Sequence, residues 1–488
     1  MRTRNRLAIT LLASSTILLG VAAPAQAAPS PTELVADIVP GTGSGNPSDL
    51  TPVADRLYFV ANDGSGDELF VSDGSVGSAT NLNLNPTGAS SPQSLVVIGD
   101  TLYFSATDGV AGRELWSVTG SGAPTMVADI EAGAGGSDPI DFTLYNGDVY
   151  FRAFTSGTGQ VVFRLSGGTV SAYPTNTTLS APSNFFEYND LLYFAVSGPD
   201  RNQLYRLDGT NPPVQFAVTN ASGSANPKNF AVAGGVLYFL ANDAANGQPF
   251  NYELYATNGV SAPTKLTTDL VDNNGYQYFT VFNDTLYFSG GSAATGRELG
   301  TATAGAAPTY FDINTGAGSS DPQGFTPYAG SLYFNAFTPT SGDELFSITG
   351  AAAPALRADI NPGTASSYPF SFVVSNSKLV FSAISTGIDA QLWSFDGTTA
   401  RQESAIVSAN ADVYEVVTLG DFVYFKATST ANGIELWRTR IDAAAVTATP
   451  ALAATGSDAL LPAGMAAALL LAGLALALTR RRALKTQE

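Results

Sequence analysis

The sequence predicts an all-β protein that folds as a single β-propeller of four-stranded blades. A short apolar-aromatic triplet recurs nine times at spacings of 43–49 residues, and a period of roughly 40–50 residues is typical of propeller blades. Gly (49 residues), Tyr (20) and Phe (28) are abundant while charged residues make up only 13%, which favours strands joined by tight turns. Long helical periodicity is absent between the two ends of the chain.

The stretch from Gly99 to Ile130 represents the repeat. It holds the triplet Leu102-Tyr103-Phe104, a glycine-rich gap, Glu114-Leu115-Trp116, a turn and a last short strand. The other triplets are Leu57-Tyr58-Phe59, Val149-Tyr150-Phe151, Leu192-Tyr193-Phe194, Leu237-Tyr238-Phe239, Leu286-Tyr287-Phe288, Leu332-Tyr333-Phe334, Leu379-Val380-Phe381 and Val423-Tyr424-Phe425. The second signal follows most triplets, at Glu68-Leu69-Phe70, Gln203-Leu204-Tyr205, Glu298-Leu299-Gly300, Glu344-Leu345-Phe346, Gln391-Leu392-Trp393 and Glu435-Leu436-Trp437.

Each copy predicts four strands in order. A first strand such as Ser94–Ile98 leads through a hairpin pair such as Gly99-Asp100 to the strand that carries the triplet. The triplet is apolar on both faces of its strand, which suits a sheet packed between two neighbours. A third strand with the Glu-Leu-aromatic signal often ends in a glycine turn such as Asp73-Gly74, and a fourth strand such as Thr125–Ile130 completes the copy.

The two ends of the repeat region predict how the ring closes. Thr32–Ile38 has the pattern of a fourth strand with no preceding three, and the last copy has only three clear strands. The N-terminal strand can therefore complete the last blade and leave no large sheet edge exposed. Nine blades are expected, and eight blades with one degenerate copy is the alternative. An open β-solenoid is a further alternative, against which the unpaired strand at each end argues.

The N-terminus predicts a signal peptide over residues 1–27. Arg2, Arg4 and Arg6 precede an apolar run, and Ala25-Gln26-Ala27 matches a small-residue cleavage site before Ala28. The alternative is an uncleaved anchor, for which the apolar run is short.

The C-terminus has four parts in order: a linker rich in Ala, Thr and Pro (442–451), the pentapeptide Leu452-Ala453-Ala454-Thr455-Gly456, an apolar segment (459–479) and a basic tail (480–488). The apolar segment is long enough to form a transmembrane helix, and the basic tail would lie in the cytoplasm. This arrangement resembles the cell-wall sorting signal of Gram-positive surface proteins, with Ala453 in place of Pro as in the form typical of actinobacteria. The resemblance implies that a sortase cleaves between Thr455 and Gly456 and joins Thr455 to peptidoglycan. The alternative is a single-span membrane protein.

The repeats resemble the ELWxxDGT family of secreted bacterial proteins from about residue 31 to 441. Residues 68–74 and 392–398 carry its motif, and residues 37–41 and 359–363 match its inter-repeat segment. The resemblance implies an extracellular surface protein with a propeller-like fold. The chain departs from the motif at Gln203, Gln391 and Gly300.

Composition excludes several kinds of chemistry. The chain has no Cys and no His, so thiolate chemistry and a Ser-His triad are excluded. Without the signal peptide and everything after Thr455, 15 basic and 39 acidic residues remain (22 minus 7, and 41 minus 2), a charge of −24 that disfavours nucleic acid. The repeated Glu suggests a structural device, because acid catalysis needs one fixed carboxylate pair. The chain is predicted not to be an enzyme, and no catalytic residue is singled out.

One loop is a candidate calcium site, and no other cofactor is expected. Asp63 and Asp67 stand at short spacing in a glycine-rich loop, and carboxylates of this kind suit Ca²⁺. A solvated hairpin loop is the alternative, because the full calcium-loop pattern is missing.

The function predicted from these features is adhesion or binding at the cell surface. The inter-repeat loops, including residues 41–48, 133–139, 316–322 and 363–369, should gather on one face of the ring and contact an extracellular protein or glycan. The expected partners are sortase, peptidoglycan and that ligand, with membrane contact only through the C-terminal segment. The alternatives are an extracellular enzyme acting on glycans or peptides through Asp or Glu at the ring centre, and a purely structural wall protein.

Overall fold

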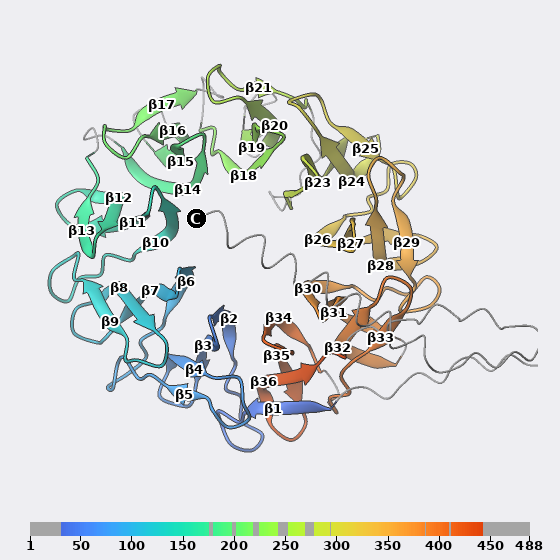
Figure 1. Cartoon of the computed structure of the whole chain (residues 1–488), viewed down its shortest axis with the longest axis horizontal. Helices are drawn as coiled ribbons and strands as arrows, with labels where there is room; N and C mark the ends of the chain where they lie inside the picture. The colour runs from blue at the N-terminus through green and yellow to red at the C-terminus, as the bar shows by residue number, and fades with distance from the viewer. Residues whose placement is uncertain are drawn as a thin grey trace, which may run out of the picture. The chain divides into compact units, whose positions relative to one another are not determined.

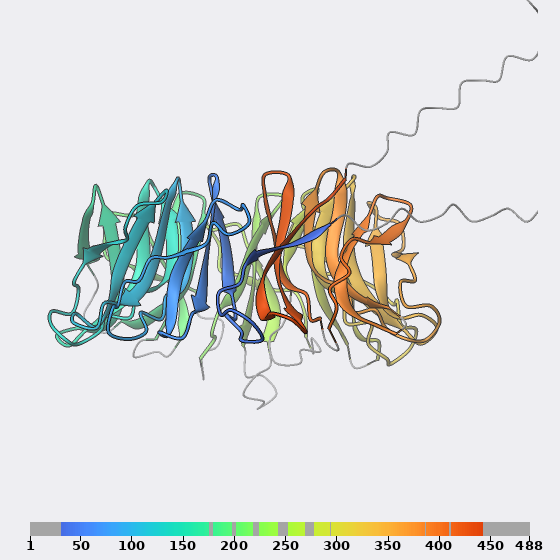
Figure 2. The same ribbon diagram turned by 90° about the horizontal axis from the view of Figure 1, so that it is seen from below.

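The computed structural model describes residues 31–442 except 175–178, 198–201, 218–223, 243–251, 269–277, 293, 386 and 409–410. Within these residues the chain forms 36 strands and no helix, arranged as nine four-stranded antiparallel sheets. Figure 1 shows the sheets as blades set around one axis, and Figure 2 shows the same blades from the side. The all-β propeller predicted from the repeats is therefore confirmed, with nine blades rather than eight.

Each blade consists of four consecutive strands, except the ninth. Blades 1 to 3 are β2 (Ser48–Val53), β3 (Arg56–Asn62), β4 (Asp67–Ser72), β5 (Thr80–Asn81); β6 (Gln93–Ile98), β7 (Thr101–Thr107), β8 (Arg113–Thr119), β9 (Thr125–Ala128); β10 (Ile140–Tyr145), β11 (Asp148–Thr155), β12 (Gly159–Ser166), β13 (Thr169–Ala172). Blades 4 to 6 are β14 (Ser180–Tyr188), β15 (Leu191–Ser197), β16 (Gln203–Leu207), β17 (Val214–Ala217); β18 (Lys228–Ala233), β19 (Val236–Asn242), β20 (Tyr252–Thr257), β21 (Thr264–Lys265); β22 (Thr280–Phe282), β23 (Thr285–Ser292), β24 (Gly296–Ala302), β25 (Thr309–Phe311). Blades 7 to 9 are β26 (Gln323–Tyr328), β27 (Ser331–Thr338), β28 (Gly342–Ile348), β29 (Ala355–Ala358); β30 (Phe370–Ser375), β31 (Lys378–Ser385), β32 (Ile388–Phe395), β33 (Ala400–Gln402); β34 (Tyr414–Leu419), β35 (Phe422–Ser429), β36 (Gly433–Arg440), β1 (Thr32–Ala36).

The first strand of each blade lies nearest the axis, and the fourth lies at the rim (Figure 1). The first strands of neighbouring blades contact one another all the way round, including β2 with β34. The ring is thus closed by packing between the blades as well as by the pairing of β1.

The ninth blade is completed by the N-terminal strand, as predicted. β1 pairs antiparallel with β36, so that Thr32 lies opposite Thr439 and Leu34 opposite Trp437. The register shifts after Leu34, and Val35, with 1% of its surface exposed, packs in a cluster with Leu57 of blade 1. The N-terminal strand therefore joins blade 9 to blade 1 through both a sheet edge and a core.

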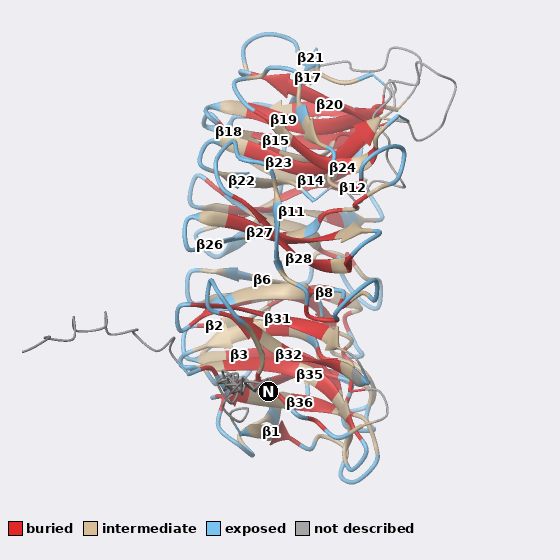
Figure 3. Cartoon of the chain, turned by 90° about the vertical axis from the view of Figure 1, so that its right-hand side faces the viewer, coloured by how far each residue is buried: buried red, intermediate tan, exposed pale blue. Residues whose placement is uncertain are grey.

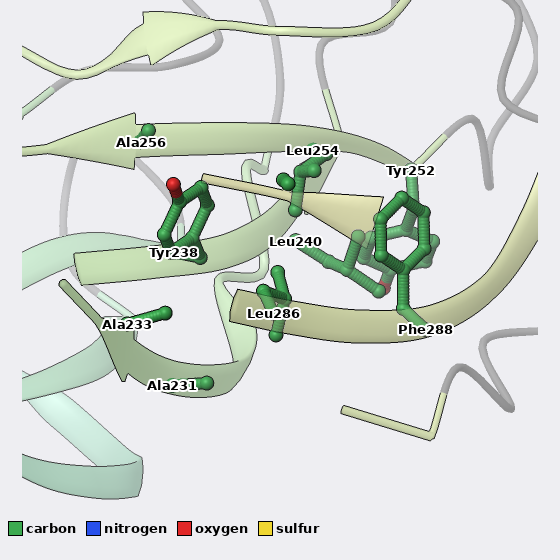
Figure 4. Packing of buried hydrophobic residues seen from close by; sticks show 10 residues of the cluster. Ala231, Ala233, Tyr238, Leu240, Tyr252, Leu254, Ala256, Leu286 and Phe288 are labelled. Carbon is green, nitrogen blue, oxygen red and sulfur yellow. The ribbon is translucent and has the colours of Figure 1, made fainter. Parts of the chain in front are cut away.

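The triplets form the cores between blades. Leu57, Tyr58 and Phe59 are fully buried, and the triplets of the other blades are buried too, except that Tyr103 is partly exposed (Figure 3). Figure 4 shows one such core, in which Leu286 and Phe288 of blade 6 pack against Leu254 and other apolar side chains of blade 5. Burying one large apolar side chain stabilises the fold by about 1.5–3 kcal/mol. These interfaces are therefore the main source of stability.

Triplet tyrosines also link blade 9 to a glycine turn of blade 1, and blade 1 to a glycine turn of blade 2. The Tyr424 hydroxyl donates to the Gly74 carbonyl at 2.9 Å, and Tyr58 makes the equivalent bond to Gly120. Gly74 has φ +84°, and a Cβ there would lie 2.2 Å from the Tyr424 hydroxyl. The glycine of the repeated Asp-Gly turn is therefore required for both its backbone conformation and this close approach.

At Gly300 the motif lacks its aromatic residue, and the ring of a neighbouring residue occupies the space. It pairs with Phe288 across the sheet, and an added Cβ would lie 2.6 Å from the Phe288 ring. In other blades two rings stack at this place, as Phe59 and Phe70 do with centroids 5.5 Å apart. The departure from the motif is thus accommodated by one ring that occupies the space of two.

We expect Gly300→Ala to destabilise the propeller by about 1–3 kcal/mol, because the added methyl group overpacks the core. Gly157→Ala is the control, since nothing lies within 4 Å of its Cβ and its φ is not in the left-handed region. Urea unfolding followed by tryptophan fluorescence measures both variants. Equal midpoints for the two would contradict the packing described here.

Candidate functional site

The repeated glutamate of the Glu-Leu-aromatic signal is buried and holds the loop that leads to the next blade. The Glu114 carboxylate accepts hydrogen bonds from the backbone N–H groups of Ile130 and Ser137, both at 2.9 Å, and from the Ser137 hydroxyl at 2.6 Å. Burial of Glu114 is complete. Its oxygens are therefore used by the fold.

Four other glutamates make the same contacts. Each accepts hydrogen bonds from backbone N–H groups of the loop that follows its blade. The donors are Leu84 and Ser90 for Glu68, and Ile313 and Ser320 for Glu298. They are Ile360 and Asn361 for Glu344, and Ile38, Val39 and Gly45 for Glu435. Glu435 of blade 9 thus binds the segment that connects β1 to blade 1. At Gln391 the side-chain oxygen accepts from Ile406 N at 3.0 Å, and its Nε2 donates to the Ile406 carbonyl. The structural role predicted for the repeated Glu agrees with these contacts.

Burial raises the pKa of Glu114, Glu298 and Glu435, and raises that of Glu344 to about 7. Hydrogen bonds from the loop act in the opposite direction in each case. Each of these carboxylates is bound by donors of the loop that leads to the next blade. They do not form the split pair that general acid–base catalysis requires.

We expect Glu344→Gln to cost less stability at about pH 8 than at about pH 5. Because the pKa of Glu344 is raised to about 7, the folded chain keeps a proton that the unfolded chain releases near pH 4.5. That stabilisation is complete below about pH 4.5 and is lost as the pH rises through about 7, by at most about 3 kcal/mol. Glutamine does not titrate, so the gap between wild-type and variant urea midpoints should narrow with rising pH. A widening gap would contradict the assignment.

The glutamates bring the inter-blade loops to one face of the ring, as predicted. These loops also bond to the hairpins between second and third strands: Ser91 N donates to Asp67 O, and Thr107 N to Ser90 O. The opposite face carries the remaining turns, such as that at Gly74, which the Tyr424 hydroxyl contacts. We call the first of these the loop face.

At the inner end of eight of these loops, within the described residues, lies one residue with a left-handed backbone. These residues, which we call the mouth positions, have φ between 43° and 49° and are Asn46, Ser91, Asp138, Ala181, Asn226, Asp321, Tyr368 and Asp412. In seven of these eight described positions both flanking residues are buried, while the mouth residue itself is exposed or half-buried. The backbone is thus the same from blade to blade, and the side chain varies.

Three residues further on, the first strand of the blade carries a second left-handed residue, at a β-bulge. These wall positions are Asp49, Ser94, Asp141, Asn184, Asn229, Gly324, Ser371 and Glu415, and the strand register shifts at each of them. A bulge beside the axis turns a side chain out of the regular alternation. Two of the three acidic wall positions among the described residues form an ion pair: Asp141 lies 3.6 Å from Arg152, and Glu415 lies 2.7 Å from Lys426.

The residue after the wall position is Phe in blades 3, 4, 5, 7 and 8, and blade 6 has Phe279 at the equivalent place. These side chains pack on the triplet Phe of their own blade with ring centroids 5.3–5.9 Å apart and are Phe142, Phe185, Phe230, Phe279, Phe325 and Phe372. Four of them, from blades 5 to 8, line a pocket of about 500 Å³ together with the wall positions Asn229, Gly324 and Ser371. One side of the axis is therefore aromatic.

A second pocket, of about 610 Å³, lies where blades 8, 9 and 1 meet on the loop face. We call it the mouth pocket. Mouth positions Asn46 and Asp412 line it, with wall positions Ser371 and Glu415 and the aromatic Tyr414. Phe370, Lys426, Thr428 and Ile434 complete the lining. Of the cavities formed by described residues, this one combines charged, amide and aromatic groups from three blades.

The calcium candidates Asp63 and Asp67 lie in the hairpin between β3 and β4, and their oxygens bind the loop itself. Asp63 accepts from the hydroxyl of Ser65 at 2.6 Å and from Asn81 Nδ2 at 2.8 Å, while Asp67 accepts from Asn62 Nδ2. These bonds lower the pKa of Asp63. Among the described residues no group of three or more Asp, Glu, His or Cys is placed to hold a metal.

The export and sorting predictions fall outside the described residues. They comprise the signal peptide (1–27) with Ala25, Ala27 and Ala28, residues 443–451 of the linker, the pentapeptide 452–456, the apolar segment (459–479) and the tail (480–488). Within the part of the chain that the structure describes, no helix has the length and apolar character needed to cross a bilayer.

Sequence comparisons found no matching family model and no matching curated protein. Solved structures similar to this chain include the computationally designed Ika8 protein (10% identity, TM-score 0.39, covering 72% of this chain and 96% of that one). They also include a structure from a study of two prolyl endopeptidases (11% identity, TM-score 0.39, 80% of this chain and 55% of that one) and puromycin hydrolase (13% identity, TM-score 0.38, 72% and 62%). This chain thus spans just over half the length of the two hydrolytic enzymes.

The prediction that the chain is not an enzyme is contradicted by these neighbours, which include hydrolases by name, and it does not stand. The absence of His had argued against catalysis, but it excludes only some kinds of chemistry. At 10–13% identity the likeness is one of fold, so no reaction is transferred to this chain.

Sequence reasoning located the loops but missed the mouth and wall positions. The pattern Ser-x-Pro at Ser137-Asp138-Pro139, Ser320-Asp321-Pro322 and Ser367-Tyr368-Pro369 was a usable signal for the mouth positions. No pattern marks the mouth pocket, because Tyr414 and Lys426 face each other only through strand pairing.

Proposed function

We propose that this chain is an exported propeller, anchored to the cell wall, that binds an extracellular protein or glycan through its loop face. The N-terminal pattern up to Ala27 supports export, and Leu452–Gly456 before an apolar segment and a basic tail supports attachment by a sortase. The partners are then sortase and peptidoglycan, besides the ligand. A body charge of −24 argues against nucleic acid as that ligand.

The main support for a binding role is that the mouth positions share one backbone conformation but carry different side chains. Their φ values agree within a few degrees, yet the side chains include Asn46, Ala181, Asp321 and Tyr368. A left-handed conformation is costly for Ala or Tyr, at about 1–2 kcal/mol, and favours Gly or Asn. Folding alone would therefore select the same small residue in each blade, and the observed variety suits recognition of an asymmetric ligand.

Attachment is tested by fractionating cells that express the full chain. The expected product is a wall-linked species whose last residue of this chain is Thr455, found by mass spectrometry after peptidoglycan digestion. Thr455→Ala should leave the chain in the membrane fraction. Wild-type chain that ends at Glu488 and stays wholly in the membrane would contradict the anchor.

Binding is tested with the full chain, purified in detergent, on arrays of extracellular proteins and glycans. Replacing the mouth residues Asn46, Asp138 and Tyr368 by Ala should remove binding of whatever target the wild type retains. The matched control replaces Asp55 and Asp100, in turns between first and second strands, by Ala. Equal loss in both sets, or in neither, would contradict a role for the loop face.

A further inference from the structure

The mouth pocket has the lining that a sugar ring needs. Tyr414 is 40% exposed, and its ring lies 5.2 Å from that of Phe370 between centroids, so an aromatic pair borders the cavity. An exposed aromatic face pairs with the apolar C–H face of a pyranose, and large aromatic side chains are enriched in such anchor positions.

The polar part of the lining is rich in acceptors. Asp412, Glu415 and Asn46 surround the cavity, and carboxylates and amide oxygens accept hydrogen bonds from hydroxyl groups. The second oxygen of Glu415, Oε2, is buried and has no hydrogen-bond partner among the described residues. A buried acceptor without a partner is costly unless a donor reaches it.

The acidic side chains of the mouth pocket disfavour an anionic ligand. Lys426 is the one base in the lining, and it is already bound to Glu415 at 2.7 Å. Burial and, to a smaller extent, the charge of Glu415 raise the pKa of Asp49, the neighbouring wall position. A phosphate or a carboxylate ligand would meet this negative field, whereas a neutral polyol supplies hydroxyl donors without charge.

The volume limits the ligand to a small molecule or the end of a chain. About 610 Å³ lies within the range of small-ligand sites, roughly 300–1,000 Å³. Ser371 also lines the aromatic pocket along the axis, so a longer glycan could continue from the mouth toward Phe372.

We propose that the mouth pocket binds a neutral pyranose residue, with its apolar face on Tyr414 and its hydroxyl groups donating to Asp412 and Glu415. This assignment rests on the proposed binding role of the loop face and names its ligand class and place. The other wall acid with a paired base, Asp141, has Ile140 where blade 9 has Tyr414, so blade 3 offers the charges without the aromatic platform.

The test is saturation-transfer NMR with the full chain purified in detergent. The probes are neutral methyl hexopyranosides, including that of N-acetylglucosamine, with inorganic phosphate and an arginine dipeptide as charged comparators. We expect one or more of the sugars to bind with a Kd on the order of millimolar, as is usual for a ligand of about a dozen heavy atoms. Tyr414→Ala and Glu415→Gln should each weaken this binding at least about 10-fold.

Two controls separate binding from folding. Leu144→Ala removes an apolar side chain that is 49% exposed, against 40% for Tyr414. Glu33→Gln removes a carboxylate paired with Arg438 at the rim. Both variants should bind the sugar as the wild type does. No sugar signal, binding of the arginine dipeptide alone, or sugar binding unaffected by Tyr414→Ala would each overturn the proposal. If the wild type binds its array target while Tyr414→Ala changes nothing, this inference fails and the proposed function stands. If sugars bind to the mouth pocket but no chain is attached to the cell wall, this inference stands and the proposed wall anchoring fails.

Discussion

Replacing Glu344 by Ala is expected to lower the free energy of unfolding by about 3–5 kcal/mol. The change leaves the backbone N–H groups of Ile360 and Asn361 and the Ser367 hydroxyl without their acceptor, in a site that is fully buried. Each unsatisfied buried donor costs about 1–3 kcal/mol. Equilibrium urea unfolding measures the loss.

Glu344→Gln is the control, and blade 8 is its natural precedent. Gln391 holds its loop with one accepting oxygen and one donating Nε2, so the amide should restore most of the stability and cost about 1–2 kcal/mol. If Ala and Gln are equally damaging, the hydrogen bonds from the loop are not what makes this position important. If neither is damaging, the loop is held by other contacts.

Val35→Asp is expected to prevent stable folding, with a loss of more than about 4 kcal/mol. Val35 belongs to the strand that completes blade 9 and packs with Leu57 and Phe59 of blade 1. A carboxylate there is buried without a partner, and the closing strand would leave the edge of β36. Circular dichroism and limited proteolysis of the exported chain report the result.

Val374→Asp is the matched control, because Val374 also lies in a strand but is 45% exposed. It should change the free energy of unfolding by less than about 1 kcal/mol. A Val35→Asp chain as resistant to protease as the Val374→Asp chain would mean that β1 is dispensable and that the ring is closed by packing between β2 and β34 alone.

Much of the frame could be predicted from the repeats. The triplet in nine copies predicted the buried middle strands, and the isolated pattern at Thr32–Ile38 predicted the strand that closes the ring. These predictions succeed because a residue repeated at a fixed period reports a contact made in every blade. The same logic assigned the repeated Glu to the structure, and the loop contacts of Glu114 and Glu344 agree with it.

The mouth pocket could not be predicted, because it is made of residues that do not repeat. Tyr414 and Lys426 lie opposite each other because β34 and β35 pair. Asn46 is far from them in sequence and lines the same pocket because the ring closes between blades 9 and 1. Gly300 shows the same limit within the core: its environment depends on how the Phe288 ring turns. Such contacts depend on the register of particular strands, which periodicity does not report.

The central claim is a division between repeated residues that build the ring and blade-specific residues that bind. Its most direct test is the double change Tyr414→Ile and Glu415→Asp, which copies Ile140 and Asp141 of blade 3 into blade 9. The backbone accepts these residues, since Glu415 and Asp141 share a left-handed φ (52° and 60°) and a paired base at the equivalent place.

Sugar binding by NMR and urea unfolding should be measured on the same sample of this double variant. We predict an unfolding free energy within about 1 kcal/mol of the wild type and sugar binding at least about 10-fold weaker. Unchanged sugar binding would contradict the claim, and so would a loss of stability that accompanies the loss of binding.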